Sequence, residues 1–174
     1  MKPDLDRIDA QILAALQKNG RLSNKELAAQ VGLAPSSCLE RFRRLKALNL
    51  IRGIHAQVAP EVLGIGLQAF ISIRLRRHRR TAVQSFKDHA LTLPEVVAVY
   101  NVTGEVDFLV HVVVRDARHL FELARDAFTT RGEVDHLQTS LIFEAVRRPE
   151  WPDLREPPEP RAPGRRKRSK QPTR

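Results

Sequence analysis

The chain has 174 residues, of which 42% are hydrophobic and 5% aromatic, which is enough for one or two small domains with apolar cores. No run of 18 or more apolar residues occurs, and four charged residues precede the first apolar stretch, so we expect neither a membrane span nor a signal peptide. The single cysteine, Cys38, excludes an internal disulfide and a multi-cysteine metal site. These features predict a protein of the reducing cytoplasm.

The positive charge is concentrated at the two ends of the chain. Residues 1–60 hold ten Lys/Arg against five Asp/Glu, and residues 147–174 hold ten against four, whereas residues 61–146 hold ten against eleven. Cationic ends around a neutral middle favour a polyanionic partner such as nucleic acid. The alternative is that the basic ends only increase solubility.

Three short helices are predicted within the first sixty residues. The first has apolar residues at helical spacing over 8–16, after acidic capping residues, and ends at Asn19-Gly20. The second begins at the S-x-x-E capping box of Ser23 and Glu26 and stops at Gly32. Pro35 suits the first turn of a third helix, which Asn49 can end in the left-handed conformation. Residues 51–58 then predict a short β-wing.

The third helix is typical of a recognition helix that follows a tight turn. Its buried stripe comprises Cys38, Phe42 and Leu45. The residues that point away from this stripe or flank it are the candidate DNA contacts, together with one residue of the wing: Ser36, Ser37, Glu40, Arg43, Arg44 and Arg52. Hydroxyls, guanidinium groups and a carboxylate can all read base edges or hold phosphates in the major groove. A three-helix protein–protein module is the alternative.

The second half of the chain predicts a ferredoxin-like fold. Its pattern changes to period 2 after Gly64-Ile65-Gly66, and the order is a strand over 67–76, a helix over 83–93, strands over 96–102 and 106–114, a helix over 120–128 and a strand over 137–146. Apolar residues occupy both faces of these strands, and two helices can cover only one face. The other face therefore needs a partner, for which a second copy of the chain is the simplest source.

The predicted organisation is an α+β chain with four parts. These are a winged helix-turn-helix DNA-binding domain (1–60), a hinge (61–66), a ferredoxin-like βαββαβ domain (67–148) and a disordered Pro-rich basic tail (149–174). The tail holds seven of the eleven prolines and the cluster Arg165-Arg166-Lys167-Arg168. It either contacts a partner or has no role beyond solvation.

Motifs in both halves resemble the Lrp/AsnC (feast/famine) transcriptional regulators over about residues 4–147. In the first half they are Leu5-Asp6, Gly20-Arg21-Leu22-Ser23, Glu26-Leu27-Ala28, and Arg41 with Leu45; in the second, residues 103–109 and 139–143. Two positions depart from the family pattern: Ala34 stands where a serine commonly caps the recognition helix, and Asn49 replaces a usual glycine.

The resemblance implies a RAM-type C-terminal domain that mediates dimerisation, often up to octamers, and binds a small effector, usually an amino acid. The positions that match its effector site are Thr103, Gly104, Glu105, Val106, Asp107, Phe108, Thr139 and Ser140. A glycine turn can offer amides to a carboxylate, and Asp107 can pair with an ammonium group. From spacing alone, Gly104 only makes the hairpin turn and Asp107 faces solvent.

The resulting hypothesis is a DNA-binding regulator that binds double-stranded DNA as a homodimer or a larger assembly, responds to an effector, and needs no cofactor or metal. One alternative is an enzyme similar to sirohaem decarboxylases, which would use Arg41, His111 and His136. Another is an architectural DNA-binding protein without an effector. The sequence contains no P-loop, nucleophile elbow or dinucleotide fingerprint.

Overall fold

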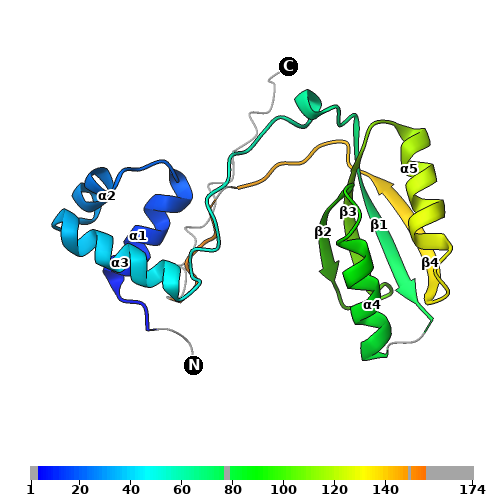
Figure 1. Cartoon of the computed structure of the whole chain (residues 1–174), viewed down its shortest axis with the longest axis horizontal. Coiled ribbons are helices and arrows are strands. Elements are labelled where there is room, and N and C mark those ends of the chain that lie inside the picture. The colour runs from blue at the N-terminus through cyan, green and yellow to red at the C-terminus, as the bar shows by residue number, and fades with distance from the viewer. Residues whose placement is uncertain (1–3, 77–78, 149, 156–174) are drawn as a thin grey trace, which may run out of the picture. The chain divides into compact units, whose positions relative to one another are not determined.

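The computed structural model describes residues 4–76, 79–148 and 150–155 (Figure 1). These residues form two compact units. One contains the residues up to His55 together with the segment that starts at Arg147, and the other spans Ala56–Val146. Residues 56–60, which we expected in the first domain, therefore group with the second. No helix of the described chain is both long and apolar enough to cross a lipid bilayer.

The first unit is built on three helices, α1 (Arg7–Lys18), α2 (Asn24–Val31) and α3 (Pro35–Ala47). Capping boxes begin α1 at Asp6 and α2 at Ser23, and Gly32 ends α2 in the left-handed conformation with φ of 69°. The buried core consists of Ile12, Leu27, Ala28, Val31, Cys38 and Leu45. All three predicted helices are confirmed.

The wing was predicted wrongly, because the structure has no strand between residues 51 and 59. No strand of the described residues pairs with this segment, and its Ile54 and Val58 are exposed, so nothing stabilises it as a strand. The chain enters it from the turn that ends α3. The Asn49 N–H donates to the Lys46 carbonyl and the Leu50 N–H to the Leu45 carbonyl, and Asn49 itself is left-handed with φ of 55°.

The second unit has a short 3-10 helix, η1 (Pro60–Leu63), and then a four-stranded antiparallel sheet in the order β2-β3-β1-β4. The strands are β1 (Leu67–Leu75), β2 (Val96–Asn101), β3 (Phe108–Val114) and β4 (Val134–Leu141). This order is that of the predicted ferredoxin-like topology. The last strand begins and ends earlier than expected, and Phe143 lies outside it with 97% of its surface exposed.

Both helices of this unit, α4 (Arg80–Ala90) and α5 (Ala117–Leu123), pack on the same face of the sheet. A π-helical segment, Ala124–Thr129, extends α5. The core contains Phe86 and Phe128 from the helical layer and alternate residues of the central strands, including Ile71, Ile73 and Val110. The opposite side of the sheet, called the open face here, carries the intervening residues: Gln68, Phe70, Ser72, Tyr100, Leu109, His111 and Val113.

Residues 150–155, called the strap here, contradict the prediction that the chain is disordered from residue 149. The strap lies along α1: the Trp151 N–H donates to Gln17 Oε1 at 2.7 Å, and the Arg155 guanidinium to the Leu5 carbonyl at 3.1 Å. These anchors are single hydrogen bonds and bury little apolar surface. Amino-acid composition reports apolar content, so it could not predict them. The rest of the predicted tail, 156–174, lies outside the described residues.

Candidate DNA-binding and effector sites

Helix α3 turns one side to the core and the other to solvent. Cys38 and Leu45 are fully buried, and burial raises the pKa of the Cys38 thiol. Ser36, Ser37, Glu40 and Arg43 are all exposed. The helix therefore presents the candidate DNA contacts on one continuous outer surface, as its periodicity predicted.

The first turn of α3 has an unusual beginning. Ala34 is the N-cap residue and provides no side-chain hydrogen bond, while Pro35 occupies the first turn. Asn24 Nδ2 donates to the Pro35 carbonyl at 2.8 Å, so the start of α2 fixes the start of α3. This contact was not predicted, because it joins residues of two helices that no local pattern relates.

The arginines of α3 divide into two groups. Arg43 has no ion-pair or hydrogen-bond partner among the described residues, so it is available to a ligand. Arg44, which we also expected to contact DNA, instead donates to Asp9 Oδ2 at 3.3 Å and to the Asp4 carbonyl at 2.9 Å. Its side chain is 47% exposed, so it is tethered to α1 without being buried.

Arg41, the neighbour of Arg44 on α3, completes this link to α1. It donates to Asp6 at 2.6 Å and to the fully buried Asp9 carboxylate at 2.9 Å. The Asp9 N–H and then the Arg41 guanidinium lower the pKa of Asp6, and the same contacts with Asp6 and Asp9 raise the pKa of Arg41. The network orients α3 on α1, and Arg52 remains exposed on the strandless segment after it.

The loop between β2 and β3 holds the first part of the candidate effector site. Thr103, Gly104 and Glu105 are exposed, and Gly104 adopts a φ of 123°, a conformation that other residues rarely take. Val106 is half-buried, and Phe108 is fully buried in the core. Phe108 therefore anchors the end of the loop in the core of the second unit, and its side chain offers no surface to a ligand in this chain.

Asp107 does not face solvent, so the interpretation from spacing alone is wrong for this residue. It is 9% exposed, and its Oδ2 accepts a hydrogen bond of 2.7 Å from the Leu75 N–H, where the pairing of β1 and β4 shifts register. Its own N–H donates to the Ile73 carbonyl at 2.8 Å. Asp107 thus fixes the end of β1 to the β2–β3 loop.

Thr139 and Ser140 are exposed on β4 but do not adjoin this loop. Thr139 on β4 pairs with Ile71 of β1, whereas Phe108 at the start of β3 pairs with Ile73. One intervening strand, β1, and two residues along it therefore separate the two parts of the candidate site. Thr139 and Ser140 also point to opposite faces of the sheet, since they are consecutive. One chain alone does not bring these polar groups together.

Within the second unit, the two histidines required by the enzyme alternative do not converge either. Arg41 is committed to Asp6 and Asp9 in the first unit. In the second unit, His111 contacts Gln68 Oε1 at 3.1 Å and stacks beside Phe70, whereas His136 is exposed opposite Arg74. The register places the two histidines on different strands and four residues apart along β1.

Comparisons with known proteins match both units. A model of the AsnC-type helix-turn-helix domain matches residues 5–46, and a model of the Lrp/AsnC ligand-binding domain matches residues 68–152. The HTH-type transcriptional regulator AldR of Mycolicibacterium smegmatis is 42% identical over 144 residues, which are 83% of this chain and 84% of that protein. The leucine-responsive regulatory protein of Escherichia coli is 36% identical over 83% of this chain and 88% of its own length.

The fold is shared as well. The crystal structure of a transcriptional regulator from Neisseria meningitidis in complex with L-Met superposes with a TM-score of 0.77 at 33% identity, over 83% of this chain and 94% of that one. The structure of E. coli AsnC superposes with a TM-score of 0.75 at 27% identity, over 84% and 97% of the two chains. Both modules, their order and their folds agree, and the chain belongs to the Lrp/AsnC family of helix-turn-helix transcriptional regulators.

Proposed function

We propose that this regulator reads double-stranded DNA with α3 and adjusts its assembly or DNA affinity when it binds an amino acid. The observation that carries the DNA-binding role is the outer surface of α3, where Ser36, Ser37, Glu40 and Arg43 are exposed and Arg43 has no partner among the described residues. Arg52 adds a cation after the helix. Side chains of this kind on one helix face suit the major groove.

Assembly is supported by the open face of the sheet. No helix among the described residues of the second unit covers Phe70, Leu109 and Val113 there, and Tyr100 beside them is 48% exposed. Pairing with a second copy would bury this apolar surface and place two α3 helices in successive major grooves. We expect the chain to scatter light as a dimer or larger species, and Leu109→Arg to reduce the mass while a control on α4, Gln84→Arg, does not.

An amino-acid effector is supported by the polar groups of the β2–β3 loop and by the L-Met bound to the N. meningitidis regulator. The exposed N–H groups around Gly104 suit a carboxylate, and the hydroxyls of Thr139 and Ser140 suit an ammonium or a side chain. Because a single chain keeps the loop and β4 apart, we place the effector where two copies adjoin.

A thermal-shift screen of the twenty amino acids tests the effector. A ligand present at 100 times its Kd stabilises the folded protein by about 2.7 kcal/mol, which is enough to raise Tm by several degrees. We expect one amino acid or a small chemical group of them to raise Tm, and Thr139→Ala to reduce the shift without changing the Tm of the free protein. Equal Tm values with all twenty would contradict an amino-acid effector.

A further inference from the structure

Helix α1 places a buried carboxylate against α3. The Asp9 side chain is fully buried, and it accepts hydrogen bonds from Arg41 at 2.9 Å and from Arg44 at 3.3 Å. A buried carboxylate must be paired, because taking it out of water without a partner is strongly unfavourable. Arg41 already provides a hydrogen-bonded counter-ion at the shorter distance, so pairing Asp9 does not by itself require Arg44.

Arg44 lies at the edge of the outer surface of α3 that carries the candidate DNA contacts. Ser37 precedes it by about two helical turns, so the two side chains leave the helix in nearly the same direction. The neighbouring Arg43 is exposed and has no partner among the described residues. The Arg44 side chain is 47% exposed, so phosphates beside a bound α3 are within its reach unless another group holds it.

Two contacts hold the Arg44 guanidinium against α1. Its Nη1 donates to Asp9 Oδ2 at 3.3 Å, and its Nη2 donates to the Asp4 carbonyl at 2.9 Å. Both terminal nitrogens therefore have acceptors, and the carboxylate compensates the positive charge. Because Asp9 is buried, water screens its attraction for the guanidinium less than it screens a surface carboxylate.

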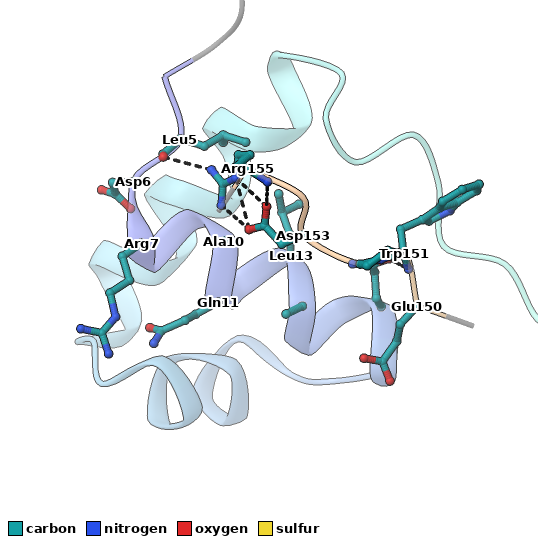
Figure 2. Close-up of a pocket in the computed structure, with 13 residues that line it drawn as sticks. Leu5, Asp6, Arg7, Ala10, Gln11, Leu13, Glu150, Trp151, Asp153 and Arg155 are labelled. Carbon is teal, nitrogen blue, oxygen red and sulfur yellow. Dashed lines mark hydrogen bonds and ion pairs between the residues drawn. The ribbon is translucent and has the colours of Figure 1, made fainter. Parts of the chain in front are cut away.

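The strap fixes the beginning of α1, where these acceptors lie. Arg155 donates to the Leu5 carbonyl at 3.1 Å, a contact that Figure 2 shows as a dashed line. Leu5 directly follows Asp4, whose carbonyl binds Arg44. It precedes Asp6, whose side chain caps α1. The strap thus helps to keep the acceptors of Arg44 in place.

We propose that Asp9 is a positioning residue that limits sequence-independent DNA binding by withholding the Arg44 guanidinium from phosphates. Phosphate contacts carry no sequence information, and each one raises the affinity for every duplex. A protein that must find one site among many competing sequences benefits when such contacts are few. This role of Asp9 rests on the proposed DNA binding by α3.

The first test compares the wild-type chain with Asp9→Asn on a fluorescently labelled duplex of mixed sequence, titrated at several salt concentrations. Asn keeps the shape of the side chain and removes its charge, so the charge of Arg44 is no longer compensated. Each phosphate neutralised contributes about −0.9 to the slope of log K against log salt. We expect Asp9→Asn to bind this duplex several-fold more tightly at low salt, with a slope steeper by about 0.9.

Two matched variants show whether Arg44 is the released cation. Adding Arg44→Gln to Asp9→Asn should restore the wild-type slope, which a general loosening of the first unit does not predict. Asp4→Asn removes one negative charge near the same arginine but keeps the carbonyl that binds it. The Asp4 carboxylate has no partner among the described residues, so this variant should keep the wild-type slope.

Arg44→Gln alone tests the same role even if Asp9→Asn does not fold, because it leaves the contact between Asp9 and Arg41 intact. We expect Arg44→Gln to keep the wild-type slope, since Arg44 binds no phosphate in the wild-type complex. Circular dichroism at the assay temperature establishes which variants are folded.

Four results would overturn this role of Asp9 and leave the proposed function standing. They are a wild-type slope in folded Asp9→Asn, a steep slope that persists after Arg44→Gln is added, an equal change in Asp4→Asn, and a slope shallower by about 0.9 in Arg44→Gln alone. The last would show that Arg44 already binds a phosphate in the wild type. If the wild-type chain binds no DNA at any salt concentration, the proposed function is rejected as well.

Discussion

The Asp107 carboxylate holds the end of β1 through the Leu75 N–H, and the sequence predicts this residue as an effector contact. Asp107→Ala leaves this buried N–H without its acceptor, which should lower the free energy of unfolding by about 1–3 kcal/mol. Asp107→Asn keeps an acceptor oxygen and removes the charge, so we expect near-wild-type stability. Urea unfolding of the two variants measures the difference.

The same pair separates structure from ligand binding. If the carboxylate also pairs with the ammonium of an effector, Asp107→Asn should lose the ligand-induced rise in Tm although it folds normally. An Asp107→Ala protein as stable as the wild type would contradict the structural role derived from the Leu75 contact.

The two exposed arginines of α3 should behave differently when each is replaced with glutamine. Arg43→Gln should weaken DNA binding by about 1–3 kcal/mol, or roughly 5- to 150-fold, and leave Tm unchanged, because Arg43 has no partner among the described residues. Arg44→Gln should lower Tm, because it removes the contacts with Asp9 and Asp4. Anisotropy titration and thermal unfolding of both variants check this, and equal effects of the two on DNA affinity and Tm would contradict it.

At the scale of elements, α3 begins without a side-chain cap. Ala34→Ser supplies an oxygen for the free N–H groups of the first turn and should stabilise the first unit by about 1 kcal/mol. Ala34→Val, which has no such oxygen, is the control. Thermal unfolding reports the change, and a Tm of Ala34→Ser no higher than that of the wild type would count against the uncapped start.

Helix α1 should be sensitive to acid, because its cap depends on an ionised carboxylate. The pKa of Asp6 is lowered from 3.8, chiefly by the Asp9 N–H and then by Arg41. A lowered folded-state pKa contributes stability that is complete above the unfolded value and is lost as the pH falls through the folded one. Urea unfolding should therefore show Asp6→Asn less stable than the wild type at neutral pH, with a difference that shrinks below pH 3.8.

A constant difference between Asp6→Asn and the wild type down to the lowest accessible pH would show that the charge of Asp6 has no part in the cap. Asn retains the acceptor for the Asp9 N–H, so the comparison isolates the charge and its contact with Arg41.

Local signals predicted most elements of this chain. Ser23 with Glu26, Gly32 and Pro35 set the helix boundaries of the first unit, because caps and stops act within a few residues. The sequence pattern did not predict that β4 starts at Val134. This start is fixed by the pairing of Val134 with Leu75 of β1, where the register of the two strands shifts. Likewise, Arg44 was assigned to DNA because nothing near it in the sequence reveals Asp9, its partner on α1.

At the scale of the whole molecule, the two units have different proposed roles, DNA binding for the first and assembly for the second. The first unit carries the outer surface of α3 and the strap that binds α1. The second unit has one sheet face covered by α4 and α5 and one open face with apolar side chains. We expect the open face to set the number of α3 helices that act together, and thereby the length of DNA that is read.

The central claim is that α3 reads a specific DNA sequence, and selection of binding sites from a random duplex pool tests it most directly. The full chain should enrich a shared, roughly palindromic motif, because paired helices read related half-sites. Replacing Ser36, Ser37 and Arg43 with alanine should abolish that enrichment while the protein stays folded. A pool that remains random after selection by the wild-type protein, or the same motif selected by the variant, would contradict the claim.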